Sequence, residues 1–309
     1  MGAQLRVYRR RVRSVQSTQK ITKAMELVAA SRIAKAQARI RAARPYAEEL
    51  TRALAALGRN ASLEHPMLTG VDNPRRSGIL MITSDRGLAG GYSANVLRRA
   101  NQLADQVIGD GKEPVRYVIG RKGVGFFAFR GIDVEGSWTG FSEQPTFLDA
   151  RDATEAVVGS LEATSEGQSR GSRGIDELYV VYTRFHSLAS QTVEVVQVAP
   201  VKAAGDPAEE MEAQGLQAAY EFEPDPEELL DALLPRYVSA RLFSALLEAA
   251  ASESAARQRA MKAASDNADD LIRTYTRLAN EARQAEITQE ISEIVGGASA
   301  LAGAGSDEQ

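Results

Sequence analysis

The residues most suggestive of chemistry lie in the stretch ITSDRGLAGGYSAN, residues 82–95. An apolar run ends there in Thr83 and Ser84, and three glycines lead into a helical pattern. A glycine-rich turn between a strand and a helix can bind phosphate, because backbone N–H groups and the positive end of the helix attract anions. The stretch therefore raises the question of a nucleotide-binding site and of an enzyme built around it.

The glycine spacing matches neither common nucleotide-binding motif. A P-loop requires GxxxxGK[ST], and in GLAGGY the glycines are followed by a tyrosine and not by a lysine. A dinucleotide fingerprint requires GxGxxG with an acidic residue about 20 positions later, and only the second condition is met, by Asp105 and Asp110. An anion held beside Arg86 stays an alternative. We favour glycines that let a tight turn pack against a neighbouring element.

Composition limits the remaining chemistry. The chain has 309 residues, 44% hydrophobic and 25% charged, which suits one or two packed domains. It has no cysteine, so thiolate chemistry and cysteine–zinc sites are excluded. The two histidines, His65 and His186, lie far apart in the sequence. We therefore expect no thiolate nucleophile and no metal site built from cysteine or clustered histidine. The N-terminus has no signal peptide pattern and the chain has no run of 18 apolar residues, so we expect a cytosolic protein unless a partner holds it at a membrane.

Charge is distributed unevenly along the chain. Residues 1–59 carry fourteen Lys/Arg and three Asp/Glu, a net charge of +11. Residues 60–224 carry fifteen and twenty-three, a net charge of −8, and residues 225–309 carry eight and fifteen, a net charge of −7. The two ends therefore have opposite signs, which favours their pairing.

The first segment has the period of a coiled-coil helix. Only Gln19, Thr22 and Glu26 interrupt its apolar heptad positions, and Pro45 predicts a bend because the pattern continues on both sides of it. These positions are Leu5, Tyr8, Val12, Val15, Gln19, Thr22, Glu26, Ala29, Ile33, Ala36, Ile40, Ala43, Ala47, Leu50, Leu54 and Leu57.

The last segment predicts a second long helix, which starts near Asp225 at PDPEELL. Its heptad positions are mostly small, so a partner helix can approach closely. They are Ala250, Ser254, Arg257, Met261, Ala264, Ala268, Leu271, Tyr275, Leu278, Ala282 and Ala285. The two helices are each other's obvious partner, and a compact domain between them returns the chain, so we expect an antiparallel coiled coil. The last helix is the longer one and should continue alone near its C-terminus.

Between the helices, short apolar strands alternate with helical stretches. Strands are predicted at 77–84, 114–120, 176–185 and 191–200, and helices near 91–109, 121–130 and 149–163. The predicted fold class is α/β: a long antiparallel coiled coil of residues 1–59 and 225–309, with a central Rossmann-like foot domain of residues 60–224. The segment AGAGSDEQ, 302–309, is predicted to be a frayed tail.

Three stretches in this order resemble the gamma subunit of the F-type ATP synthase, the central rotor shaft. They are QKITKAMELVAASRIAKAQ (19–37), SDRGLAGGYSAN (84–95), and RQRAMKAASDNADDLI through NEARQAEITQEISEIVGGA (257–298). The resemblance spans the chain from end to end. It implies a shaft that stands in a hexamer of alpha and beta subunits, with its foot on a proton-driven membrane ring of c subunits and beside the epsilon subunit. It further implies one copy per complex and a peripheral place at the cytoplasmic face of a bacterial plasma membrane. It also implies no bond chemistry by this chain, with no catalytic residue, bound cofactor or metal.

The resemblance also implies roles for individual residues. Contacts with the hexamer are expected from Lys20, Lys23, Met25, Arg257, Arg283, Gln284, Thr288 and Glu290. An apolar bearing at the tip is expected to receive Ile291, Ile294 and Val295. For Lys20, Lys23 and Met25, the alternative is that they are ordinary surface residues of a coiled coil.

Two further interpretations stay open at this stage. The segment 164–176 is long for a helix-to-strand connection, and its Arg170 and Arg173 either belong to a surface loop without function or pair transiently with acidic groups and slow rotation. The basic block RVYRRRVR, 6–13, could instead track nucleic acid phosphates. The heptad continues through that block, which argues for a coiled coil and against a free basic arm.

Overall fold

The structure is a computed structural model, and it describes residues 2–60, 65–165, 174–201 and 225–304. The chain divides into two compact units. The smaller unit combines residues 1–28 with 258–309, and the larger unit comprises residues 29–257. Two long helices, α1 (Gly2–Asn60) and α7 (Pro226–Ala304), each contribute to both units.

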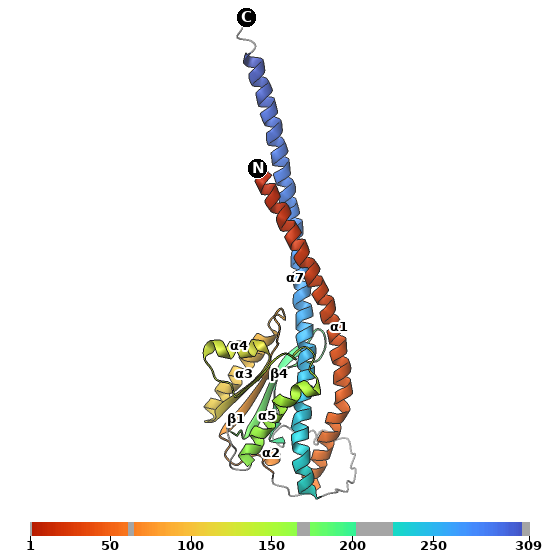
Figure 1. Cartoon of the computed structure of the whole chain (residues 1–309), viewed down its shortest axis with the longest axis vertical. Helices are drawn as coiled ribbons and strands as arrows, with labels where there is room; N and C mark the ends of the chain where they lie inside the picture. Colours follow the sequence, from red (N-terminus) through yellow and green to blue (C-terminus); the bar gives the residue numbers. More distant parts are fainter. Residues whose placement is uncertain (1, 61–64, 166–173, 202–224, 305–309) are drawn as a thin grey trace. The chain divides into compact units, whose positions relative to one another are not determined.

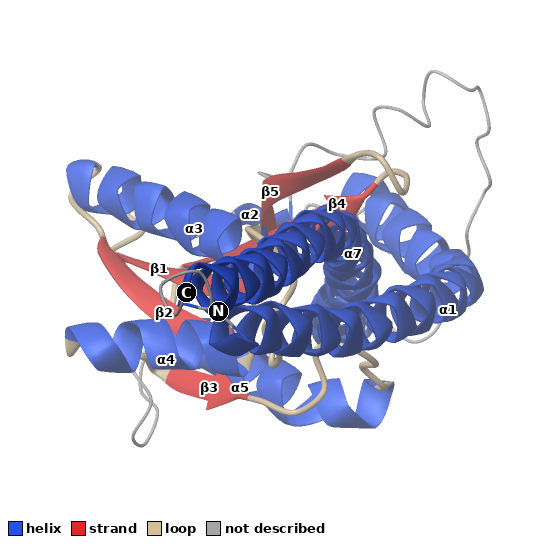
Figure 2. Ribbon diagram, turned by 90° about the horizontal axis from the view of Figure 1, so that it is seen from above, coloured by secondary structure: helices blue, strands red, loops and turns tan. Residues whose placement is uncertain are grey.

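The larger unit is built on a five-stranded sheet of order β3-β2-β1-β4-β5 (Figure 2). The strands are β1 (Arg76–Ile82), β2 (Glu113–Ile119), β3 (Gly136–Trp138), β4 (Glu177–Phe185) and β5 (Gln191–Ala199). The first four run parallel, and β5 is antiparallel to β4. The strand order reverses between β1 and β4, and doubly wound sheets place ligands at such a reversal.

The central strand β1 is covered on both faces. Its residues after Arg76 are all buried, which explains why Gly78–Ile82 form a continuous apolar run that does not alternate. Leu80 and Ile82 belong to one hydrophobic core, and Ile79 and Met81 belong to the other. This period of two places a core on each side of the sheet.

Helices form the outer layers of the larger unit. Helices α3 (Tyr92–Gly109) and α4 (Arg121–Arg130) share the core of Ile79 and Met81. The other core includes residues of α2 (Pro66–Thr69) and α5 (Phe147–Ser165), Leu54 of α1, and residues 230–249 of α7. The end of α1 and the beginning of α7 are therefore part of the hydrophobic core of the sheet domain.

In the smaller unit, α1 and α7 pack against each other antiparallel (Figure 1). The Tyr8 ring stacks on the Tyr275 ring with centroids 6.5 Å apart, and the Thr22 and Ser265 hydroxyl oxygens are 2.7 Å apart. Residue numbers therefore rise along α1 as they fall along α7. Helix α7 continues past the beginning of α1, and its residues from 287 to 295 are all exposed.

The predicted elements are confirmed with shifts of one or two residues at their ends. The sequence interpretation missed two short elements, the three-residue strand β3 and the four-residue helix α2, because neither is long enough to show a period. Pro45 lies inside α1, as expected. The predicted tail was wrong for residues 302–304, which complete α7, while residues 305–309 lie outside the described chain.

Candidate partner-contact surfaces and the loop that anchors them

Asp85, the second residue of the SDRGLAGG loop, ties together three loops at one edge of the sheet. Its carboxylate accepts backbone N–H bonds from Arg121 (3.1 Å), Gly140 (2.8 Å) and Ser142 (3.0 Å). Its own N–H donates to the Ser142 hydroxyl at 2.8 Å. These partners follow β2 and β3, so the loop after β1 is fixed to both neighbouring connections. A carboxylate that accepts several N–H bonds in a mostly buried position is a stabilising arrangement.

The glycine-rich turn directs carbonyl groups toward a cation on α7. The Arg257 guanidinium donates to the carbonyl oxygen of Arg86 at 3.4 Å and to that of Gly87 at 3.3 and 3.4 Å. The Tyr92 hydroxyl, at the start of α3, donates to the Ala249 carbonyl of α7 at 3.3 Å. Gly90 has φ +57°, which a side chain would strain. The loop therefore packs against a neighbouring helix, as the favoured interpretation predicted.

Arg257, one of the expected hexamer contacts, is buried among groups of its own chain. Its side chain is 6% exposed and forms ion pairs with Glu253 (2.7 Å) and with Glu143 (3.1 Å). With its guanidinium occupied by two carboxylates and two carbonyl groups of the same chain, it is an internal anchor and not a free polar group on the helix surface. The heptad spacing cannot distinguish an arginine that is buried by its own chain from one that contacts a partner, because both occupy the same face of the helix.

Glu253 is the buried partner of Arg257 in this anchor. It is 1% exposed, and burial raises its pKa from 4.5 to about 6, although the hydrogen bond from Arg257 opposes the rise. Burial also raises the pKa of Tyr92 well above 10, with the Glu253 charge as the second cause. The sequence interpretation missed Glu253. The available signal was an acid four residues before an arginine inside an otherwise small-residue stretch, AAASESAAR.

The three polar residues that interrupted the heptad of α1 lie in the seam. Thr22 is 8% exposed and its hydroxyl pairs with that of Ser265, while the Gln19 amide donates to Asp269 of α7 at 2.5 Å. The Glu26 side chain is 14% exposed and forms an ion pair with Lys23 at 2.9 Å. The seam of the smaller unit therefore contains a polar band between apolar and aromatic contacts.

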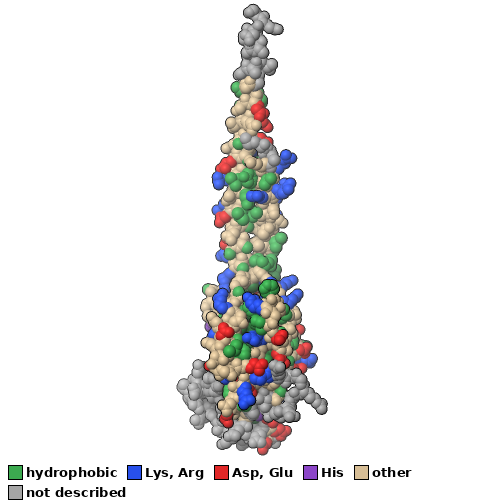
Figure 3. Space-filling view, turned by 90° about the vertical axis from the view of Figure 1, so that its left-hand side faces the viewer, with side chains coloured by type: hydrophobic (Ala, Val, Ile, Leu, Met, Phe, Trp, Pro, Cys, Tyr) green, Lys and Arg blue, Asp and Glu red, His purple; other side chains and the backbone are tan. Residues whose placement is uncertain are grey.

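The expected contact residues of α1 surround this band. Lys20 and Lys23 are exposed and Met25 is half-buried. Beside them, Ile21, Leu27 and Val28 are more than half exposed, which the sequence analysis did not single out. Figure 3 shows hydrophobic and basic side chains interspersed along the paired helices. Large apolar side chains grouped on an exposed helix face are typical of a surface that meets a partner.

The expected contact residues near the end of α7 are also exposed. Arg283, Gln284, Thr288 and Glu290 all face solvent. The expected bearing residues are exposed to a similar extent, with Ile291 at 56%, Ile294 at 71% and Val295 at 59%. Apolar side chains this exposed on a helix gain stability only by entering an apolar environment.

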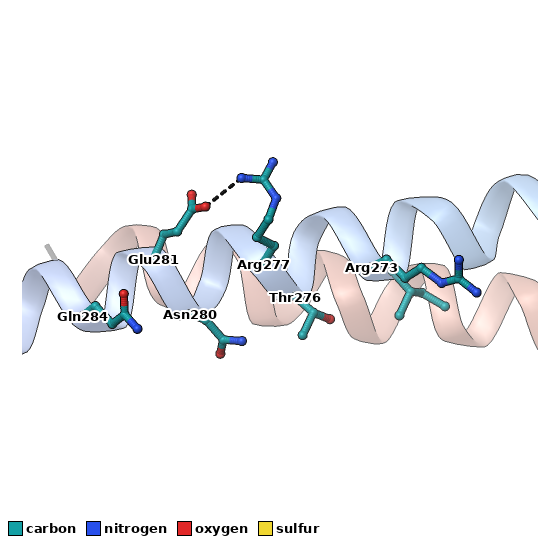
Figure 4. Close-up of a pocket in the computed structure, with 7 residues that line it drawn as sticks. Arg273, Thr276, Arg277, Asn280, Glu281 and Gln284 are labelled. Atoms are coloured by element: carbon teal, nitrogen blue, oxygen red, sulfur yellow. Dashed lines mark hydrogen bonds and ion pairs between the residues drawn. The ribbon is translucent and has the colours of Figure 1, made fainter.

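One face of α7 in the smaller unit forms a shallow hollow (Figure 4). An ion pair at 2.6 Å joins Arg277 and Glu281 beside it. The hollow is lined by Ile272, Arg273, Thr276, Arg277, Asn280, Glu281 and Gln284. Polar groups on this face are therefore accessible to a partner, and Gln284 of the expected contact set is among them.

The remaining expectations divide into two groups. Arg170 and Arg173 lie outside the described residues. Directly after residue 173, the Gly174 carbonyl accepts a hydrogen bond from Arg76 at 2.5 Å and Ile175 is fully buried. In the described part of the chain, no group of three histidine, aspartate or glutamate side chains is arranged to hold a metal ion. In the same part, none of the helices is both long and apolar enough to cross a membrane.

Comparisons with known proteins agree over nearly the whole chain. The family model described as ATP synthase matches residues 4–301. The ATP synthase gamma chain of Acidothermus cellulolyticus is 53% identical over 99% of this chain and 100% of its own length. The gamma chains of Frankia casuarinae and Mycolicibacterium smegmatis are 55% and 54% identical over 98% of this chain and 99% of their own.

Solved structures show the same fold at low identity. The rotor of the Euglena gracilis mitochondrial ATP synthase in rotational state 1 gives a TM-score of 0.66 at 17% identity, over 93% of this chain and 100% of that one. A central-stalk chain of the Tetrahymena thermophila enzyme gives 0.55 at 22% identity, over 79% and 99%. With over half of the residues identical to full-length relatives, the chain belongs to the family of ATP synthase gamma chains.

Proposed function

We propose that this chain is the central rotor shaft of a proton-driven ATP synthase. It transmits rotation of a membrane ring of c subunits to a hexamer of alpha and beta subunits, and so couples proton flow to ATP synthesis and hydrolysis. The observation that carries the proposal is the full-length identity to ATP synthase gamma chains. The paired helices support it, because an asymmetric rod presents a different face to each surrounding subunit.

The chain acts by differential contact and performs no bond chemistry of its own. A rotating shaft changes the ligand affinity of a neighbouring site only by the difference in contact free energy between orientations. Exposed polar groups such as Lys20, Arg283 and Glu290 suit this role, because each solvated contact is weak and is replaced easily as the shaft turns. The full proposed set is Lys20, Lys23, Met25, Arg283, Gln284, Thr288 and Glu290.

The end of α7 is proposed to turn in an apolar bearing. Ile291, Ile294 and Val295 are exposed here, and a sleeve of apolar side chains in the hexamer would bury them without directional bonds. Non-directional contacts permit rotation at nearly constant energy. The epsilon subunit and the c ring are proposed to contact the sheet domain, with one copy of this chain in each complex. The complex would lie at the cytoplasmic face of the plasma membrane, with this chain bound to the membrane only through its partners.

We further propose that the sheet domain binds no nucleotide or other cofactor. The carbonyl groups of Arg86 and Gly87 face the guanidinium of Arg257, so the turn offers acceptors where a phosphate needs donors. Calorimetric titration of the purified chain with MgATP checks this, and saturable binding that Arg257→Met abolishes would revive the nucleotide-binding alternative.

Rotation can be tested directly, because the chain has no cysteine. Ile108→Cys on α3, where Ile108 is 55% exposed, provides a single attachment point for a bead or fluorophore. The labelled chain, assembled with an immobilised hexamer, should rotate in one direction on addition of ATP and stop with ADP alone. Hydrolysis by the assembled complex without rotation of the label would contradict the rotor assignment. The unlabelled cysteine-free chain is the matched control for labelling elsewhere in the complex.

A further inference from the structure

Glu143, in the loop after β3, is the acidic partner of three arginines. It forms an ion pair with Arg32 of α1, and its carboxylate lies 3.1 Å from Nη1 of Arg257 and 3.8 Å from Nη1 of Arg86. The Glu143 side chain is 15% exposed and that of Arg32 is 24% exposed. One partly buried carboxylate thus connects α1, α7 and the loop after β1.

The backbone that carries Glu143 is itself fixed to the sheet. The preceding residue, Ser142, donates its N–H to Asp85 and accepts the N–H of Asp85 on its hydroxyl. Gln144 donates its N–H to the Phe141 carbonyl at 3.2 Å. The carboxylate is therefore held by a turn that is pinned to the edge of the sheet, and its contacts with both helices are contacts between those helices and the sheet domain.

The two helical arginines that contact Glu143 both lie close, in sequence, to the boundary between the two units. Arg257 is the last α7 residue of the larger unit, and Arg32 is the fourth α1 residue of that unit. Both helices therefore reach Glu143 just before they pass into the smaller unit, where the described contacts are those of α1 with α7. Glu143 therefore joins α1 and α7 to the sheet domain close, in sequence, to the boundary of the larger unit.

The contact of α1 and α7 with the sheet domain depends on the negative charge of Glu143. A narrow hollow beside Glu143 is lined by two further cations, Lys35 and Arg39, together with Arg32. Neutralising Glu143 would leave the cations of α1 and α7 facing one another in a partly buried place, where like charges repel more strongly than in water. Removing one member of a buried ion pair is strongly destabilising, because it leaves the other charge buried without a partner.

We propose that Glu143 is a positioning residue that fixes both long helices to the sheet domain, so that torque passes between the sheet domain and the paired helices without local slippage. This proposal rests on the rotor function proposed above. Loosening the attachment would let the paired helices turn with the hexamer while the sheet domain and the ring lag behind. Hydrolysis would then continue while fewer protons are moved for each ATP.

The test compares three variants in the assembled complex in membrane vesicles. Glu143→Gln keeps the size and removes the charge, Glu143→Asp keeps the charge, and Glu135→Gln makes the same chemical change on an exposed carboxylate just before β3. We expect Glu143→Gln to assemble, to hydrolyse ATP, and to lower the ratio of proton pumping to hydrolysis about threefold, a small change on the scale of buried charge removal. Glu143→Asp should recover most of the ratio and Glu135→Gln should leave it unchanged.

A second measurement, hydrogen exchange of the isolated full chain, does not depend on rotation. In Glu143→Gln, amides near residues 29–36 and 250–257 should exchange about tenfold faster, equivalent to about 1.4 kcal/mol of local stability. Faster exchange with an unchanged pumping ratio would overturn the proposal, as would an equal loss of pumping in Glu135→Gln or unchanged exchange in Glu143→Gln. If instead the wild-type chain supports hydrolysis but no ATP-dependent pumping, the rotor function itself fails, and this proposal fails with it.

Discussion

Glu253 provides a test of the anchor between α7 and the SDRGLAGG loop through pH. Its pKa is raised from 4.5 to about 6 in the folded chain, chiefly by burial, and its side chain is 1% exposed. A folded-state pKa above the unfolded value means that the folded chain binds the proton more tightly. The resulting stabilisation is fully present below pH 4.5 and is lost as the pH rises through about 6.

The size of the effect follows from the shift in pKa. A difference of about 1.5 units corresponds to about 2 kcal/mol in the free energy of unfolding. Glu253→Gln removes the titrating group and keeps its shape. The stability of the variant minus that of the wild type should therefore rise by about 2 kcal/mol between pH 4.5 and pH 7. Taking the difference cancels the titration of all other carboxylates.

The assay is urea unfolding of the isolated chain at four pH values from 4.5 to 7.5, followed by tryptophan fluorescence. The chain has one tryptophan, Trp138, which stacks on Tyr117 of the sheet with centroids 6.4 Å apart, so the signal reports the larger unit. Glu155→Gln makes the same chemical change on the exposed side of α5 and is the matched control. A flat or falling difference for Glu253→Gln would show that Glu253 is not a buried carboxylate with a raised pKa.

The remaining predictions concern the seam, the surface of α7 and the segment 166–173. Thr22→Val should lower the free energy of unfolding by about 1–2 kcal/mol, because the buried Ser265 hydroxyl loses its partner, and adding Ser265→Ala should restore most of it; an equally unstable double variant in urea unfolding would contradict this pairing. Arg257→Met should cost about 3 kcal/mol in the isolated chain, whereas Arg283→Ala should stay within about 0.5 kcal/mol and instead reduce ATP-driven proton pumping in vesicles; equal stability losses would refute the distinction between anchor and surface. Deletion of residues 166–173, which keeps Gly174 and the buried Ile175, should leave the complex intact while changing the ratio of ATP hydrolysis to synthesis, and unchanged rates in both directions would assign that segment to a surface loop without function.

The pairing of α1 with α7 could be predicted, because the spacing of apolar residues indicates which side of a helix faces its partner. Every predicted seam position of α1 from Leu5 to Leu57 is buried or half-buried, including the polar Gln19, Thr22 and Glu26. The prediction was weaker on α7, where Leu271 and Ala285 are exposed although they hold the heptad spacing. Near its end, α7 extends past the start of α1, so the heptad spacing there does not reflect packing against α1.

The anchor could not be predicted, because it depends on which loops the sheet topology brings to one edge. Asp85, Ser142 and Arg257 are separated by 57 and 115 residues, and no local pattern links them. Glu143 lies in an irregular turn after a three-residue strand, where neither propensity nor period carries information. The sequence did indicate that the glycine-rich turn packs against another element, but the identity of that element required the fold.

The polar band of the smaller unit sets the register of the two helices. A seam of small residues such as Ala264 and Ala268 offers nearly equivalent packing after a shift of one heptad, about 10.5 Å along the axis. Such a shift would place the Ser265 hydroxyl against an aliphatic residue such as Val15 and separate it from Thr22. The hydrogen bonds of Thr22 with Ser265 and of Gln19 with Asp269 therefore favour one register of the two helices. The paired helices can bend or twist under load without sliding past each other.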